Sequence, residues 1–140
     1  MYPEELVKPM REELTRIGFQ ELTTADEVNE VMNKSEGTTF LVVNSVCGCA
    51  AGNARPGVNL AIRNENLPDR MVTVFAGQDT DATAQARSFL TGYPPSSPSM
   101  ALFQNGQVVH VIPRHEIEGR MPEQIASELK GVFDSYCKKS

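Results

Sequence analysis

The segment from Thr38 to Asn44 constrains the fold of this chain more than any other part of its sequence. It reads TTFLVVN and is apolar or β-branched almost throughout, without the alternation of polar and apolar residues that a half-exposed strand shows. Such a run predicts a strand that is covered on both faces. The run Met71–Ala76 (MVTVFA) has the same character. Strands of this kind need helices on both sides of one sheet, so we expect a three-layer α/β fold.

Helical periodicity before, between and after these runs predicts the covering layers. The helices are expected at Glu4–Ile17, Thr24–Met32, Ala50–Asn66 and Asp79–Leu90, and from Pro122 onward. In the first of them, the spacing of apolar residues predicts an inward face made of Leu6, Met10, Leu14 and Ile17. In the second, Thr24 and Glu27 have the spacing of a capping box. In the third, Pro56 must kink the helix or begin a fresh turn.

The remaining signals complete the sheet. Asn105-Gly106 lies between two apolar runs, Met100–Phe103 and Val108–Ile112, and this dipeptide predicts a hairpin because both residues tolerate positive φ. Phe19–Leu22 is a candidate for a short further strand. We therefore expect a central mixed sheet of four to five strands flanked by helices, with an N-terminal helical extension. At 140 residues, the chain has the length of a single domain, 1–140.

Composition excludes several classes of function. Thirteen Lys and Arg against 18 Asp and Glu give a net charge of −5, which argues against nucleic acid as a partner. No apolar run approaches the roughly 20 residues that cross a bilayer, and the first residues lack the pattern of a secretory signal. We expect a cytoplasmic protein with no membrane partner. In that reducing compartment, closely spaced cysteines indicate metal or redox chemistry.

Cys47-Gly48-Cys49 lies directly after the first buried strand and directly before a predicted helix. The N-terminus of a helix carries partial positive charge and unpaired N–H groups, so it favours a thiolate over a thiol. Thiol pKa values at such positions fall from about 8.5 toward ~3.5–7.5. Only the thiolate attacks a disulfide sulfur, so this position suits a nucleophile. For the two sulfurs to bond the backbone must bend, and Gly48 is the residue at which bending costs least.

Other interpretations of this cysteine pair stay open from the residues alone. The two side chains could be small buried hydrophobes. They could also be soft ligands of a metal-binding or carrier protein, with Cys137, His110 and His115 as further donors, although no regular ligand spacing supports a closed metal site. Within redox chemistry, a tight ring of this kind would also suit a disulfide isomerase. The charged residues near the chain's last loop are expected to fix that loop rather than to catalyse: Arg114, Glu116 and Glu118.

A second motif, Ser96–Met100 (SSPSM), precedes the predicted hairpin. A cysteine motif between strand and helix, followed by a proline that opens a terminal hairpin and then by a C-terminal helix, resembles the thioredoxin fold. Four stretches make the resemblance more specific and together resemble the bacilliredoxin family over essentially the whole chain. They are NSVCGCAAG (44–52), TVFAGQD (73–79), SSPSMALF (96–103) and HVIPRHEIEG (110–119).

Bacilliredoxins are thioredoxin-fold proteins that remove the small thiol bacillithiol from mixed disulfides on other proteins. The resemblance implies that Cys47 is the nucleophile and becomes S-bacillithiolated, and that Cys49 is the resolving cysteine. It also implies a cis peptide bond at Pro98 and pairing of substrate with the backbone of Ser97. No tightly bound cofactor is implied. Bacillithiol would be the co-substrate, with bacillithiolated client proteins and a separate reductase system as partners.

Overall fold

A computed structural model describes residues 1–137 of the chain. Its centre is a five-stranded sheet in the order β1-β3-β2-β4-β5. The strands are β1 (Gln20–Glu21), β2 (Thr38–Asn44), β3 (Arg70–Phe75), β4 (Ser99–Gln104) and β5 (Gln107–Ile112). β1, β3 and β2 are parallel, whereas β4 and β5 run antiparallel to their neighbours. The expected mixed sheet of four to five strands is confirmed.

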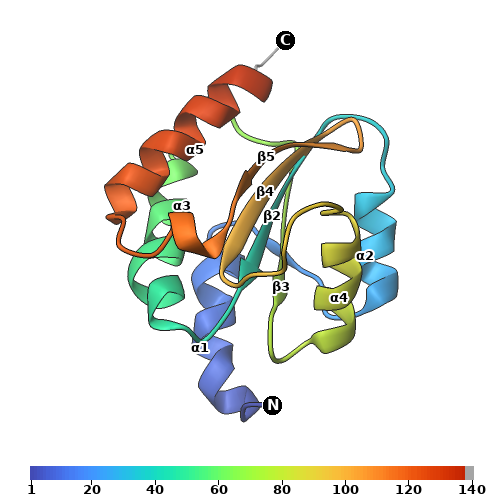
Figure 1. Ribbon diagram of the computed structural model, residues 1–140, viewed down its shortest axis with the longest axis vertical. Coiled ribbons are helices and arrows are strands. Elements are labelled where there is room, and N and C mark those ends of the chain that lie inside the picture. The colour runs from blue at the N-terminus through green and yellow to red at the C-terminus, as the bar shows by residue number, and fades with distance from the viewer. Residues whose placement is uncertain (138–140) are drawn as a thin grey trace.

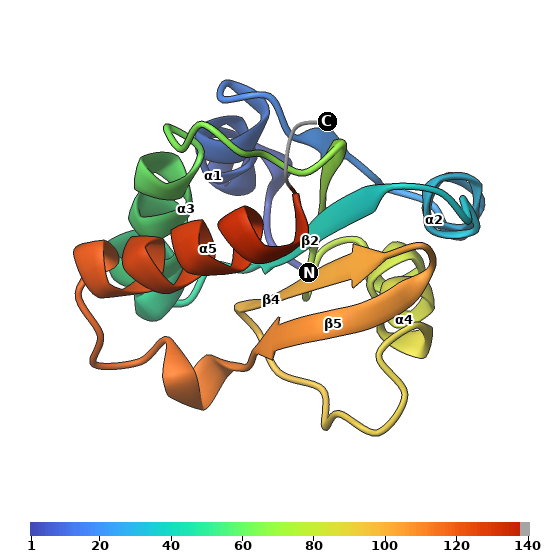
Figure 2. The same ribbon diagram turned by 90° about the horizontal axis from the view of Figure 1, so that it is seen from above.

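Helices cover both faces of this sheet (Figures 1 and 2). One layer consists of α1 (Glu4–Thr15), the π-helical turn η1 (Ala50–Ala54), α3 (Arg55–Ala61) and α5 (Pro122–Tyr136). The other layer consists of α2 (Ala25–Met32) and α4 (Thr80–Ser88). A short 3₁₀ turn, η2 (Arg114–Glu116), connects β5 to α5. The three-layer α/β architecture follows, with α1 as its N-terminal extension.

β2 is the central strand, and all of its residues are buried. Successive side chains of a strand point to opposite faces, so β2 contributes to two separate cores. Phe40 and Val42 belong to the core under α3 and α5, where the Phe40 ring meets the Phe133 ring edge-on at 5.2 Å. Leu41 and Val43 belong to the core under α2 and α4. The apolar run predicted this double burial.

Two local predictions are confirmed at atomic detail. The Thr24 side chain accepts a hydrogen bond from the Glu27 N–H, and the Glu27 carboxylate accepts one from the Thr24 N–H, which completes the capping box. In the hairpin between β4 and β5, Asn105 and Gly106 have φ of 52° and 82°. Both values lie in the left-handed region that this type of turn requires.

The predicted inward face of α1 is confirmed at Leu14, and Ile17 beyond the helix packs against the core, but the prediction is wrong at Leu6. The helix buries Val7, Arg11 and Leu14, whereas Leu6 is 48% exposed. The reason is electrostatic, because Arg11 binds carboxylates that come from other parts of the fold. Its guanidinium lies 2.6 Å from Asp79 and 2.7 Å from Glu21 and from Glu4.

The helix predicted at Ala50–Asn66 is shorter than expected. Its first turns form η1, and Pro56 then lies in the first turn of α3, where its missing N–H leaves no helical bond unmade. The helix ends at Ala61 rather than at Asn66. Asn64 and Asn66 instead donate side-chain hydrogen bonds to Asp134 of α5, a competing bond that favours a loop over a helix.

Candidate active site

The cysteine pair lies where β2 gives way to a helix. The carbonyl of Cys47 accepts hydrogen bonds from the N–H groups of Ala50 (2.9 Å) and Ala51 (3.2 Å), so the first helical turn begins at Cys47. Both cysteine side chains are half-buried, and Gly48 between them is exposed. Gly48 has no positive φ, and a Cβ added to it would meet no atom within 4 Å. The helical turn itself therefore brings the cysteines together, and the bend does not depend on a left-handed glycine.

The two sulfurs are in direct contact. Cys47 Sγ and Cys49 Sγ are 2.6 Å apart, and the Cys49 N–H donates to Cys47 Sγ at 3.4 Å. The hydrogen bonds from the thiol and the amide of Cys49 lower the pKa of Cys47. Burial raises the pKa of Cys49, and the neighbouring Cys47 sulfur raises it further. The arrangement therefore favours a thiolate at Cys47 and a proton at Cys49.

Arg114 approaches the pair from the loop that follows β5. Its positive charge helps to lower the pKa of Cys47, and the two sulfurs in turn raise the pKa of Arg114 after its main partner, Glu118. Arg114 also fixes the neighbouring loop, because its N–H donates to Ser96 Oγ and its Nη1 donates to the Ser97 carbonyl. The sequence interpretation gave Arg114 only this second role and missed the first.

Strand directions explain why these segments meet. β2 ends at Asn44, just before the cysteines, and its residue Val43 lies opposite Ser99, the first residue of β4. β5 runs back along β4, so its last residue, Ile112, reaches the same edge of the sheet. The loop before β4 and the loop after β5 therefore both lie beside Cys47. Because the strand order brings the loop after β5 to the cysteines, it could have identified Arg114 as a residue of the site.

A hollow of about 400 Å³ opens beside Cys47. Its lining residues come from the N-terminal segment, the ends of β2 and β3, α4 and the two loops: Tyr2, Ser45, Val46, Cys47, Ala76, Gly77, Arg87, Ser97 and Arg114. The Ser97–Pro98 peptide bond is cis, and Pro98 is buried. Gln78 holds the N-terminal segment in place, since its side chain exchanges hydrogen bonds with the backbone N–H and carbonyl of Tyr2 at 2.9 and 3.0 Å.

A buried arginine holds the segment that leads into the cysteine pair. Arg55 is 3% exposed and donates to Asn44 Oδ1 at 2.8 Å and to the Ser45 carbonyl at 2.9 Å. Its Nε lies 3.1 Å from a carboxylate oxygen of Glu13 on α1. Ser45 Oγ then accepts the N–H of Cys47. Arg55 is thus a positioning residue for the segment that carries the nucleophile, and no local pattern in the sequence pointed to it.

Other candidate residues lie apart from the pair or have their own partners. His110 Nε2 lies 2.7 Å from Glu128 of α5, and His115 pairs with Glu116 on the exposed η2 turn. Cys137 is buried at the end of α5, where desolvation raises the pKa of its thiol. Within residues 1–137, no three His, Cys, Asp or Glu side chains are grouped as a metal site would require. In the same range, no helix is both long and apolar enough to cross a membrane.

Comparison with known proteins places this chain in a family. Residues 2–137 match the family model described as Disulphide isomerase. A bacilliredoxin of Geobacillus kaustophilus is 56% identical over 137 residues, which cover 97% of this chain and 94% of the relative. The chain belongs to the bacilliredoxin family. A bacilliredoxin of Koribacter versatilis is 55% identical, over 98% of this chain and 94% of the relative.

Solved structures agree with the fold of this bacilliredoxin family member. Thioredoxin from Fasciola hepatica superimposes with a TM-score of 0.58 at 15% identity, covering 84% of this chain and 99% of that chain. Oxidized thioredoxin O2 from Arabidopsis thaliana gives a TM-score of 0.57 at 19% identity, covering 88% and 97%. The expected thioredoxin-like fold is confirmed. The family and the fold together support thiol–disulfide oxidoreductase activity.

The electrostatic role of Arg114 has a measurable pH dependence. Iodoacetamide reacts with the thiolate, so alkylation of Cys47 should appear as pH rises through its lowered pKa, at a lower pH than for an ordinary cysteine. Arg114→Met removes a stabilising charge and should shift the alkylation profile to higher pH, with a several-fold lower rate at pH 7. Arg63→Met, which removes an exposed arginine elsewhere, is the matched control and should leave the profile in place. Identical profiles for all three proteins would contradict this role.

Proposed function

We propose that this protein removes bacillithiol from mixed disulfides on client proteins through Cys47. The proposal rests on one observation above all: a cysteine with a lowered pKa lies beside a second thiol and lines an open hollow. The names of the relatives support the choice of bacillithiol as the small thiol. Bacillithiolated proteins, bacillithiol itself and a separate reductase system are then the partners.

In the first step, the Cys47 thiolate attacks the bacillithiol sulfur of the client's mixed disulfide. The bond between the client sulfur and the bacillithiol sulfur breaks, a Cys47–bacillithiol disulfide forms, and the client leaves as a thiolate that takes a proton from water. No electrons are gained or lost overall, because one disulfide replaces another. The pKa of the attacking thiol is lowered, so at a given pH a larger fraction of it is in the reactive thiolate form than for an ordinary cysteine.

In the second step, a thiolate attacks Cys47 Sγ and releases bacillithiol. Cys49 is the resolving residue in this proposal, since its sulfur already touches Cys47 Sγ. Attack by Cys49 leaves a Cys47–Cys49 disulfide, and two electrons from a dithiol reductant or from small thiols restore the pair. Attack by a second bacillithiol instead yields bacillithiol disulfide and Cys47 directly. Sulfur carries every electron, so no tightly bound cofactor is needed.

The neighbouring residues would receive the client. We propose that its backbone pairs with the backbone of Ser97, which lines the same hollow as Cys47. Pro98 holds that loop in a buried position against the start of β4, and the bare, exposed Gly48 leaves room for the client above the sulfurs. We further propose that residues 1–140 act as one domain and that the reaction takes place in the reducing cytoplasm.

A trapping experiment tests this function. Cys49→Ala removes the resolving thiol, so the reduced variant mixed with a bacillithiolated client should gain the mass of one bacillithiol on Cys47 and release the client's free thiol. Intact-protein and peptide mass spectrometry measure both products.

Cys47→Ala in the same mixture is the control and should remain unmodified while the client keeps its bacillithiol. A Cys49→Ala protein that gains no mass, under conditions where its Cys47 is still alkylated by iodoacetamide, would refute the proposal.

Disulfide isomerase activity is a second candidate. It is favoured by the description of the matching family model and by the contact between the two sulfurs, which allows a client trapped on Cys47 to be released by Cys49. Reactivation of a scrambled disulfide protein measures it. If reactivation proceeds no faster than with a small thiol at the same concentration, isomerase activity is excluded and the removal of bacillithiol is the only proposed function left.

A further inference from the structure

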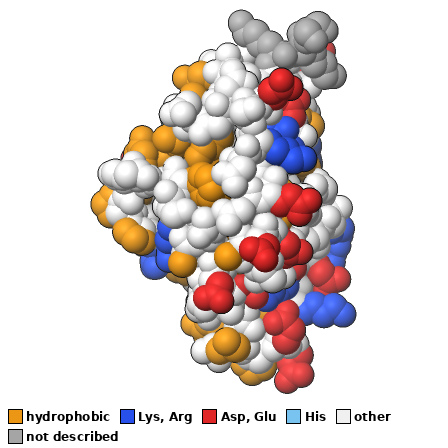
Figure 3. Space-filling model, turned by 90° about the vertical axis from the view of Figure 1, so that its right-hand side faces the viewer, with side chains coloured by type: hydrophobic (Ala, Val, Ile, Leu, Met, Phe, Trp, Pro, Cys, Tyr) orange, Lys and Arg blue, Asp and Glu red, His pale blue; other side chains and the backbone are white. Residues whose placement is uncertain are grey.

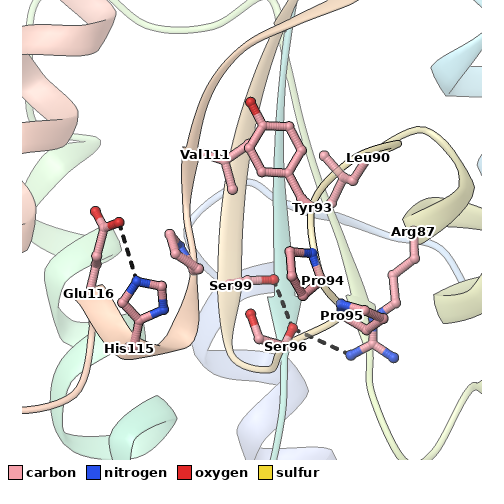
Figure 4. A pocket seen from close by; sticks show the side chains of 11 residues that line it. Arg87, Leu90, Tyr93, Pro94, Pro95, Ser96, Ser99, Val111, His115 and Glu116 are labelled. Atoms are coloured by element: carbon pink, nitrogen blue, oxygen red, sulfur yellow. Dashed lines mark hydrogen bonds and ion pairs between the residues drawn. The ribbon is translucent and has the colours of Figure 1, made fainter.

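Arg87 of α4 lines the hollow beside Cys47 but has no role in the chemistry described so far. Its guanidinium is turned toward the loop before β4, where Nη2 donates to the Ser96 carbonyl at 3.3 Å (Figure 4). Its Nε is buried and has no hydrogen-bond partner. Among residues 1–137, no carboxylate lies within ion-pair distance of Arg87, in contrast to the other two deeply placed arginines, Arg11 and Arg55.

An arginine held in this way is costly to the folded protein. Partial burial lowers the pKa of Arg87, because desolvation opposes its charge and no acid compensates. A donor left without an acceptor adds to that cost. Arg114, the other cation of the hollow, is already paired with Glu118. Arg87 therefore keeps both charge and hydrogen-bonding capacity for a group that is not part of the folded chain.

The position of Arg87 defines what it could contact. It lines the hollow of about 400 Å³ together with Cys47, and it also lines a second, mainly apolar pocket of about 370 Å³ under the 90–96 loop. Figure 4 shows Arg87 at one side of that second pocket and the paired His115 and Glu116 at the other. Volumes of this size hold small ligands rather than folded partners. A molecule attached to Cys47 Sγ would lie in the first hollow, next to Arg87.

The charge of the rest of the protein makes this arginine significant. The net charge is −5, and the face over α2 and α4 carries many acidic side chains (Figure 3). The net charge disfavours an anion over much of the surface, whereas an unpaired guanidinium that lines the hollow beside Cys47 favours one there. A guanidinium binds a carboxylate in two-pronged geometry better than it binds any neutral group.

We propose that Arg87 binds a carboxylate of the small thiol that Cys47 carries. The inference rests on the proposed function and adds to it a specificity: the site selects low-molecular-weight thiols that bear a carboxylate over neutral thiols of similar size. Arg87 acts in binding, whereas Arg114 is the arginine whose charge helps to lower the pKa of Cys47.

Two small symmetrical disulfides test the proposal without any client protein. In the Cys49→Ala background, reduced protein is mixed with either 3,3′-dithiodipropionic acid, which carries carboxylates, or 2-hydroxyethyl disulfide, which is neutral. In each case the Cys47 thiolate forms a mixed disulfide and expels one small thiolate, and mass spectrometry follows the rate. The ratio of the two rates should fall about tenfold in Arg87→Met, the size expected for one charge-assisted hydrogen-bonded contact. Arg87→Lys should recover part of the ratio, and Arg63→Met should not change it.

The outcomes separate this inference from the function on which it rests. An unchanged ratio in Arg87→Met, or an equal loss with both disulfides, overturns the inference while leaving the reactivity of Cys47 intact. Absence of any mixed disulfide at Cys47 in the parent protein counts against the proposed function itself. A further arm uses bacillithiolated peptides with acidic or neutral flanking residues. If Arg87→Met slows only the acidic peptide and neither small disulfide, the carboxylate belongs to the client, and the inference about the small thiol is wrong.

Discussion

Cys47→Ser is expected to reduce thiol–disulfide exchange to the uncatalysed rate. A serine hydroxyl is not ionised near neutral pH and forms no disulfide, so neither step of the proposed cycle can begin. Cys49 does not compensate, because burial, which the substitution leaves in place, raises the pKa of its thiol. The measurement is the rate at which catalytic amounts of protein transfer a small thiol from a labelled client to excess bacillithiol.

Cys137→Ala is the matched control for this loss. The Cys137 thiol is buried at the end of α5 with a raised pKa and does not line the hollow beside Cys47, so its removal should leave the exchange rate unchanged. Circular dichroism spectra of both variants should match the wild type. If exchange survives Cys47→Ser, or disappears with Cys137→Ala in a folded protein, then Cys47 is not the nucleophile.

Arg11→Met is expected to lower the free energy of unfolding by about 3–5 kcal/mol, the usual cost of breaking a buried charge network. The Arg11 guanidinium bridges Glu4, Glu21 and Asp79 and lies 5.2 Å from the centre of the Phe75 ring. Burial opposes its charge, but its carboxylate partners outweigh burial and raise the pKa of Arg11. Without it, the half-buried carboxylates of Glu21 and Asp79 repel each other. With a urea slope of about 2 kcal/mol/M, the unfolding midpoint should fall by roughly 2 M.

Arg16→Met is the control for this stability change. Arg16 follows α1 directly and is exposed, so its replacement should change the free energy of unfolding by less than about 0.5 kcal/mol. Arg11→Lys should fall between the two, since an ammonium group keeps the charge but not the planar geometry that reaches several carboxylates. Equal midpoints for Arg11→Met and Arg16→Met would show that the network contributes nothing to stability.

The parts of this fold that the sequence predicted well are those that local signals determine. The apolar run at Thr38–Asn44 identified the central strand because both of its faces are buried. The capping box at Thr24 and Glu27 and the hairpin at Asn105 and Gly106 were predicted because each depends on backbone conformations a few residues apart. The cysteine motif could be recognised for the same reason, because its position between a strand and a helix is also a local signal.

The parts that the sequence missed are contacts that three arginines make with other elements of the fold. Arg11 and Val7 are buried beside Leu14 where the spacing of apolar residues indicated Leu6, and Arg11 binds Asp79, 68 residues away. Arg55 reaches Asn44 and Ser45, and Arg114 reaches the loop before β4. Arginine is ordinarily a surface residue, so nothing in the local sequence distinguishes the buried Arg11 and Arg55, or the exposed Arg114 beside the cysteines, from other arginines. The fold, and not the local sequence, brings Arg55 and Arg114 to the segment that carries the cysteines.

The way Gln78 fastens the backbone of Tyr2 has a practical consequence for anyone preparing this protein. The start of the chain forms part of the wall of the hollow that contains Cys47. An affinity tag or dye attached to the first residue would therefore extend from the segment that lines this hollow, and it should slow the entry of disulfides. Kinetic work is best done on material whose leading residues are native, with purification handles placed elsewhere.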